Sequence, residues 1–300
     1  MITNWLEAFR LRTIPLSISG ICMGSFLAFS SGFSNYSLFI FALITTILFQ
    51  ILSNLANDLG DSLKGTDNEN RVGPKRTVQA GKITIKQMQI AVVLTAFFSL
   101  ISAGYLIFLA QKNMSSEMIY SYILLAVFCI VAAITYTVGK KAYGYYGLGD
   151  VMVFLFFGLV GVMGSNTLYT KQIDWLMVLP SITIGFLSTA VLNLNNMRDI
   201  VNDATSQKNT FVVKLGLKNA KIYHIILLTS SLFCLVLFAI LKQNYWITIG
   251  CIPFLPLIKH AKFVILNEEP AAFDPELKKV AITTFLVSLL TGLGLLLESM

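Results

Sequence analysis

Two short acidic motifs hold the residues with the clearest capacity for chemistry. NDLGD contains Asp58 and Asp61, and NNMRD ends at Asp199, with Asp203 four residues later. Each motif closes a long apolar segment and opens into a polar loop that carries lysines and arginines. Residues three or four apart share a helix face, so each pair of aspartates points the same way if its helix continues through the motif.

Carboxylates that face one another repel unless a cation lies between them. Their hard oxygen atoms favour Mg²⁺, which usually binds through one or two carboxylates together with water and substrate phosphates. The adjoining loops hold the complementary basic residues Lys64, Arg71, Lys75, Arg76, Arg198 and Lys208. We therefore predict a diphosphate site, in which metal and basic side chains stabilise charge that builds on a leaving group. The predicted catalytic and metal-binding residues are Asp58, Asp61, Asp199 and Asp203.

Side-chain amides line the approach to both motifs. One polar stripe contains Gln50, Asn54 and Asn57, and a second contains Asn195 and Asn196. Together with the six basic residues, the four asparagines complete the predicted substrate-binding set around the motifs.

Two alternatives compete with this interpretation of the motifs. In the first, the aspartates only solvate helix ends and pair with nearby basic residues, but two copies of one motif at equivalent loop mouths weigh against it. In the second, the protein is a secondary transporter whose carboxylates couple ion and solute movement. Transporter sites usually lie near the bilayer midplane, whereas both motifs lie at segment ends.

The apolar segments predict a membrane scaffold for the motifs. Hydrophobic residues make up 56% of the 300 residues and charged residues only 12%, against about 25% charged residues in average soluble domains. Nine uncharged segments recur, each near the roughly 20 residues that a transmembrane helix needs. They cover about 13–33, 36–57, 87–111, 118–138, 151–170, 175–197, 222–241, 243–258 and 280–297. We predict an all-α, multi-pass membrane protein of nine helices in a single domain, 1–300.

The basic residues predict its orientation in the membrane. One side of the nine segments holds 19 of the 22 lysines and arginines and both motifs, while the other side holds only Lys112, Lys171 and Lys242. By the positive-inside rule, the N-terminus and the motifs lie on the cytoplasmic side of the cell inner (plasma) membrane. The C-terminus lies on its outer side. Anionic lipid headgroups and a diphosphate account for the net charge of +7. We expect no nucleic-acid partner, because no nucleic-acid-binding module is recognisable.

Several further polar residues have two interpretations. Tyr143 and Tyr145 either belong to an interfacial aromatic belt or orient an acceptor molecule. Asp150, in the run GLGD, is expected to cap the fifth helix, with a contact to the acceptor as the alternative. His224 and His260 lack metal-ligand spacing and receive no role.

The two motifs resemble those of the UbiA superfamily of intramembrane aromatic prenyltransferases, in their NDxxD and DxxxD forms. Three runs are similar to the branch that acts on 1,4-dihydroxy-2-naphthoate in menaquinone synthesis: NDLGDSLKGTDNENRVGPKRTVQAG from Asn57, YGYYGLGDVMVFLFFG from Tyr143 and NNMRDIVND from Asn195. The run RLRTIP from Arg10 is similar to the start of the first helix in that family. The matching runs lie in the first six spans.

This resemblance implies an activity and a fold. It implies Mg²⁺-dependent transfer of a polyprenyl group from its diphosphate to 1,4-dihydroxy-2-naphthoate, with loss of CO₂ and diphosphate, giving demethylmenaquinone. A related enzyme acting on another aromatic acceptor, such as 4-hydroxybenzoate, is the alternative. The implied fold is a UbiA-like bundle whose central cavity opens to the cytoplasm. Many members place a further aspartate where this chain has Gly65, so we expect Asp67 to serve as the additional metal ligand.

Overall fold

A computed structural model of the protein describes residues 2–69 and 71–298. Its regular elements are all helical within these residues. Nine helical spans in this described part are long and apolar enough to cross a membrane. The fold-class prediction is therefore confirmed.

The helices follow one another through short connections, with a longer loop after α3. In chain order they are α1 (Ile2–Phe9), η1 (Leu11–Thr13), α2 (Ile14–Ser30), α3 (Tyr36–Leu63), α4 (Ile85–Ala110), α5 (Ser116–Thr135), η2 (Tyr143–Tyr146), α6 (Gly149–Val153), η3 (Phe154–Gly164), α7 (Ser165–Thr170), η4 (Trp175–Met177), α8 (Val178–Arg198), α9 (Ile200–Thr205), α10 (Phe211–Lys242), η5 (Tyr245–Phe254), α11 (Leu255–Leu266), η6 (Pro270–Phe273) and α12 (Asp274–Glu298). The fifth span is continuous from α6 through the π-helical η3 to α7.

Side-chain caps define where the long helices begin. The Asn35 side chain accepts the Leu38 N–H at the start of α3, and Ser115 and Thr210 cap α5 and α10 in the same way. Thr84 forms a reciprocal capping box with Gln87 at the start of α4. These caps satisfy backbone donors that have no partner within the helix.

Small residues let the central spans approach closely. A Cβ atom added at Gly158 in η3 would lie 2.6 Å from the carbonyl oxygen of Ser181 and 2.8 Å from the Cα of Gly185 on α8. On the other side of η3, Gly20 of α2 packs against Gly161. In a membrane the hydrophobic effect does not drive helices together, because lipid is as apolar as their side chains. Close backbone contacts of this kind instead hold the helices together by van der Waals attraction.

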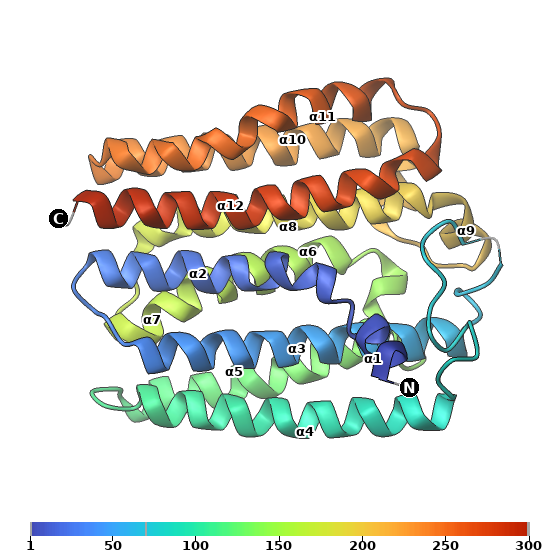
Figure 1. Cartoon of the computed structure of the whole chain (residues 1–300), viewed down its shortest axis with the longest axis horizontal. Coiled ribbons are helices and arrows are strands. Elements are labelled where there is room, and N and C mark those ends of the chain that lie inside the picture. The colour runs from blue at the N-terminus through green and yellow to red at the C-terminus, as the bar shows by residue number, and fades with distance from the viewer. Residues whose placement is uncertain (1, 70, 299–300) are drawn as a thin grey trace.

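The polar loops collect at one end of the bundle. Figure 1 shows the N-terminal α1, the loop from α3 to α4, α9 and the α11–α12 connection at the same end, with the C-terminus at the opposite end. As predicted, the two motifs lie at one end of the bundle and the sparsely charged loops lie at the other.

The last three spans are longer than their uncharged segments. The structure gives Phe211–Lys242, Tyr245–Leu266 and Pro270–Glu298 in place of 222–241, 243–258 and 280–297. Each of these spans includes charged residues near one end, where long side chains such as lysine can reach the headgroup region. The backbone of α10 is kinked at Gly216, whose φ of 75° suits a residue without a Cβ.

Candidate active site

The first motif lies on α3, which continues to Leu63, so Asp58 and Asp61 share one helix as predicted. The Asp58 carboxylate fastens the following loop back onto this helix. Its Oδ2 accepts the Thr77 N–H at 3.1 Å and the Thr77 hydroxyl at 2.6 Å, and its Oδ1 accepts the Val78 N–H at 3.4 Å. Asp58 therefore holds the loop that carries the basic residues over the end of α3.

The second aspartate of this motif meets the other motif through a lysine. The Tyr145 hydroxyl donates to Asp61 Oδ1 at 2.8 Å and lies 2.6 Å from the Thr66 hydroxyl. Lys208 Nζ lies 3.3 Å from Asp61 Oδ2 and 3.9 Å from Asp203 Oδ1. One buried ammonium group thus bridges carboxylates that are far apart in the sequence.

Asp199 lies in a second cluster of charges, beside the first. Arg198 donates to both of its oxygens, from Nε at 3.1 Å and from Nη2 at 2.6 Å. The Gly73 N–H donates to Asp199 Oδ1 at 3.3 Å, and Arg71 Nη2 lies 3.6 Å from Asp199 Oδ2. On its outer side, Arg198 Nη1 donates to Asp274 Oδ1 at 2.5 Å, which connects the cluster to the start of α12.

Asp67 is the least satisfied carboxylate of the group. Its side chain is fully buried, and neither oxygen has a hydrogen-bond partner among the described residues. Arg71 Nε and Arg76 Nε lie 3.3 and 3.7 Å from its Oδ1 and form ion pairs with it. Within the same described residues, the side-chain oxygens of Asn57 and Asn202 are also buried without hydrogen-bond partners. These oxygens retain acceptor capacity for a ligand.

The carboxylates respond differently to their surroundings. Burial raises the pKa of Asp67 and of Asp203 to about 7. Burial acts on Asp199 in the same sense, but the hydrogen bonds and charge of Arg198 hold its pKa below the usual value. Burial alone would lower the pKa of Lys208, yet the surrounding carboxylates raise it above that of a free lysine. Asp199 and Lys208 are therefore charged at neutral pH.

A cationic pocket of about 310 Å³ opens beside Asp58, between the N-terminal helix and the loop after α3. Its charged and polar lining comprises Glu7, Arg10, Arg12, Asp58, Arg71, Lys75, Arg76 and Thr77. The excess of guanidinium and ammonium groups suits a multiply charged anion such as a diphosphate.

The oxygen donors also suit Mg²⁺. Among the residues that the structure describes, no three carboxylate, imidazole or thiol groups come together as a complete metal site. Mg²⁺ needs no such cage when substrate phosphates and water supply the remaining ligands. The side-chain oxygens of Asp67, Asn57 and Asn202, which accept no hydrogen bond within the described residues, are hard donors of the required kind.

Some predicted site residues have other partners. Asn54 donates to the Phe9 carbonyl at 3.0 Å and so ties α3 to α1. The Tyr143 hydroxyl donates to the Ala132 carbonyl of α5 at 2.9 Å. Asn195 Oδ1 accepts from Arg198 at 2.9 Å, and Asn196 is buried nearby. The capping expectation for Asp150 is wrong, because Leu148 holds the N-cap position of α6 and the Asp150 side chain is buried.

A family model for UbiA prenyltransferases matches residues 17–275, which is most of the chain. The chain belongs to the UbiA prenyltransferase family. It is 42% identical over 297 residues to the 1,4-dihydroxy-2-naphthoate octaprenyltransferase of Haemophilus influenzae, covering 98% of this chain and 96% of that protein.

Solved structures of UbiA homologues share the fold. One from Aeropyrum pernix matches with a TM-score of 0.68 at 14% identity, covering 97% of this chain and 99% of that one. Another, from Archaeoglobus fulgidus and bound to DMAPP and Mg²⁺, matches with a TM-score of 0.63 at 10% identity, covering 96% and 98% of the two chains. At these identities the likeness concerns the fold, and it confirms the predicted UbiA-like bundle.

Within this UbiA fold, several residues near the motifs were missed by the sequence argument. Gly73, Thr77 and Asp274 contact the motif aspartates or Arg198. Thr66 contacts the Tyr145 hydroxyl, and Arg10 lines the cationic pocket. Asp274 carried a local signal, since it opens the acidic first turn of α12. The other contacts depend on the path of the loop, which no residue pattern reveals.

Proposed function

We propose that this chain transfers a polyprenyl group from polyprenyl diphosphate to 1,4-dihydroxy-2-naphthoate, with loss of CO₂ and diphosphate, giving demethylmenaquinone. The convergence of the two acidic motifs on Lys208, beside a cationic pocket, carries the proposal. The acceptor is assigned from the 42% identity to the Haemophilus influenzae enzyme, which spans nearly both chains.

In this proposal the aspartates of both motifs, with Asp67, hold Mg²⁺ and the basic residues bind the diphosphate. Bound Mg²⁺ supplies positive charge against the leaving diphosphate. Arg71, Lys75 and Arg76 line the cationic pocket and donate to diphosphate oxygens. Lys208 adds a buried positive charge between Asp61 and Asp203, where it favours a negatively charged leaving group.

The allylic carbon must meet an electron-rich ring before it meets water. Tyr145 closes the site from one side: its hydroxyl orients Asp61, and Lys64 Nζ lies 3.9 Å from the centre of its ring. Burial of Asp61, Asp203 and Tyr145 supports exclusion of water from this region. The acceptor binds at this face of the cluster.

We assign the polyprenyl tail to the apolar faces of α5 and of the span from α6 to α7. α5 is the least buried span, with 11% of its most apolar window buried against 33–56% in the other eight spans among the described residues. The Phe128 and Phe156 rings, 5.6 Å apart, contact each other across these two elements. An apolar wall suffices for the tail, since an isoprenoid chain is as apolar as lipid. The site faces the cytoplasm at the inner membrane, as the excess of basic residues at that end indicates.

The test is prenyl transfer by the purified protein. Radiolabelled polyprenyl diphosphate is incubated with 1,4-dihydroxy-2-naphthoate or 4-hydroxybenzoate, each with Mg²⁺ or with EDTA. We expect product only from the naphthoate and only with Mg²⁺. Exclusive use of 4-hydroxybenzoate would reject the acceptor assignment, and full activity in EDTA would reject the metal.

Asp61→Asn tests the role of the charge in the same assay, because asparagine keeps the size of the side chain. We expect the rate to fall at least about a hundredfold. Thermal stability should also fall, since buried Lys208 loses its nearest carboxylate, so rates are compared at a temperature at which the variant remains folded. Normal turnover by this variant would remove Asp61 from the catalytic set.

A further inference from the structure

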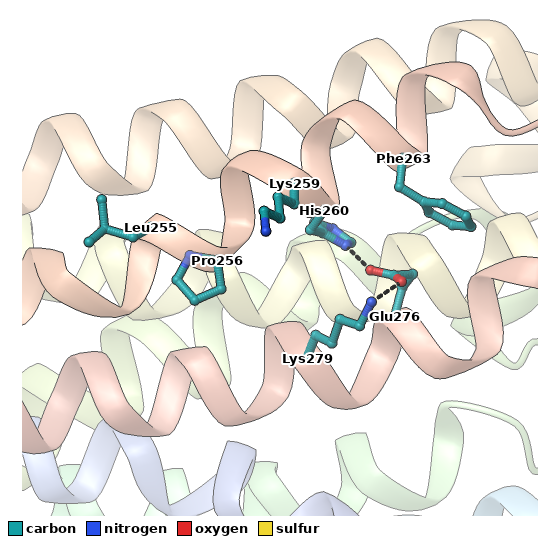
Figure 2. Close-up of a pocket in the computed structure, with 7 residues that line it drawn as sticks. All are labelled: Leu255, Pro256, Lys259, His260, Phe263, Glu276 and Lys279. Carbon is teal, nitrogen blue, oxygen red and sulfur yellow. Dashed lines mark hydrogen bonds and ion pairs between the residues drawn. The ribbon is translucent and has the colours of Figure 1, made fainter.

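A second pocket, of about 510 Å³, lies between α11 and α12 and shares no lining residue with the cationic pocket. Its lining comprises Leu255, Pro256, Lys259, His260, Phe263, Glu276 and Lys279. Figure 2 shows Lys259 from α11 and Lys279 from α12 in the space between the two helices. Leu255 and Pro256 form an apolar end of the pocket, and Phe263 lies beyond the charged residues, near Glu276 (Figure 2).

The acidic group of the pocket is already satisfied. Glu276 Oε1 lies 2.5 Å from Lys279 Nζ, and Glu276 Oε2 lies 2.5 Å from His260 Nδ1 (Figure 2). His260 Nε2 shares a hydrogen bond of 2.9 Å with His224 Nε2, and the other His224 nitrogen meets Asn193 Oδ1 at 3.2 Å. Because both nitrogens of His260 are engaged, neither His260 nor Glu276 offers a free group to a ligand.

Lys259, unlike Glu276, has no ionic partner among the described residues. It makes no ion pair or hydrogen bond with any residue in the described ranges, so its charge is uncompensated within the protein. Lys279 is 60% exposed and retains donors beyond the one directed at Glu276. The donors left in the pocket are therefore two ammonium groups, which select an anion.

The position of Lys259 in the membrane narrows the choice of anion. It lies seven residues before Leu266, the last residue of α11, which is about 10 Å along the helix axis. The neighbouring Leu255 and Ile258 are 64% and 68% exposed. In a membrane span these side chains face lipid, so a lone ammonium group at this depth requires an anionic partner or must reach for the headgroups.

We propose that this pocket binds an anionic phospholipid. The headgroup phosphate lies between Lys259 and Lys279, and an acyl chain lies along Leu255 and Pro256, which are farther from the end of α11 than Lys259 is. One phosphate charge balances the uncompensated Lys259. The apolar end of the pocket favours a lipid over free phosphate, because it adds buried hydrocarbon area to the ionic contact.

Native mass spectrometry of the full chain in detergent tests the proposal with dioleoyl-phosphatidylglycerol and dioleoyl-phosphatidylcholine as probes. We expect one retained phosphatidylglycerol and weaker retention of the zwitterionic lipid. Lys259→Gln removes no contact within the protein and should weaken phosphatidylglycerol binding about fivefold. Lys259→Arg keeps the charge and should retain binding.

Lys262→Gln is the matched control, since Lys262 is an exposed lysine of α11 outside the pocket lining. Equal loss in Lys259→Gln and Lys262→Gln would show non-specific attraction and overturn the proposal. Equal binding of both lipids would also overturn it. Displacement of phosphatidylglycerol by excess inorganic phosphate would show that the pocket recognises phosphate without the acyl chain. The readout is binding, so it is independent of prenyl transfer.

Discussion

At the scale of single residues, the site depends on a few buried side chains that have several partners each. Lys208 connects the two motifs, Tyr145 orients Asp61, and Arg198 holds both oxygens of Asp199. Removing one member of such a network leaves the remaining buried charge without a partner, which costs more than the bond itself contributes.

Tyr145 and Tyr143 offer a matched pair for testing this arrangement. Tyr145→Phe removes the hydroxyl that donates to Asp61 but keeps the ring beneath Lys64. We expect prenyl transfer to slow about tenfold, because one oxygen of a buried carboxylate loses its donor. Tyr143→Phe should leave the rate almost unchanged, since its hydroxyl contacts a backbone carbonyl of α5. Equal losses in the two variants would contradict the role of Tyr145, and steady-state rates measure both.

At the scale of elements, the site is held by the ends of helices that pack closely deeper in the bundle. η3 lies against α8 and α2 through glycines, and α12 reaches the end of α8 through the Arg198–Asp274 bond. Small shifts of these helices would therefore move the aspartates at their ends.

The glycine contact between η3 and α8 predicts a loss of stability. In Gly158→Ala the new Cβ meets backbone atoms of Ser181 and Gly185 at less than 3 Å. We expect the free energy of unfolding to fall by about 1–3 kcal/mol, which would lower the melting temperature in detergent by about 5 °C. Gly104→Ala is the control, because no atom lies within 4 Å of its added Cβ. A melting temperature unchanged in Gly158→Ala would argue against this close packing.

The bond between α12 and α8 predicts a change in metal requirement. In Asp274→Asn, Asp199 is the one ionic partner left to Arg198 among the described residues, so Arg198 would compete more strongly with the proposed Mg²⁺ for that carboxylate. The Asp274 side chain is 40% exposed, so we expect an effect of only about threefold. The Mg²⁺ concentration for half-maximal activity should rise, while Glu268→Gln, in the connection between α11 and η6, should not change it. A lower melting temperature with an unchanged Mg²⁺ requirement would limit Asp274 to a structural role.

At the scale of the whole molecule, the fold separates two ends of different charge. Both motifs, the cationic pocket and the lysines of α11 and α12 lie towards the end that carries most of the basic residues, as Figure 1 shows for the elements concerned. Under both proposals, the diphosphate and the lipid headgroup would bind at the same membrane surface.

Cysteine labelling tests this orientation. The four native cysteines (Cys22, Cys129, Cys234 and Cys251) are first replaced by serine. In right-side-out vesicles, a membrane-impermeant maleimide should label Lys112→Cys directly and Glu268→Cys only after permeabilisation, because the two positions lie at opposite ends of the bundle. The reverse pattern would invert the proposed topology.

The sequence alone determined the features that depend on local composition. Uncharged segments of spanning length predicted nine helices, and the one-sided distribution of lysines and arginines predicted which loops lie together. The two motifs were recognisable because their residue types and spacing lie within a few consecutive positions. These properties follow from lipid solubility and charge, which act on each segment separately.

Only the tertiary structure decided which polar groups meet. In the structure, Asp58 binds the loop at Thr77, and Lys208 lies between Asp61 and Asp203. His224 is hydrogen-bonded to His260, although no sequence pattern linked these two residues. Such contacts depend on the rotation and depth of each helix and on the path of the long loop. Those quantities are set by packing among residues far apart in the chain, where glycine contacts and buried ion pairs select one arrangement.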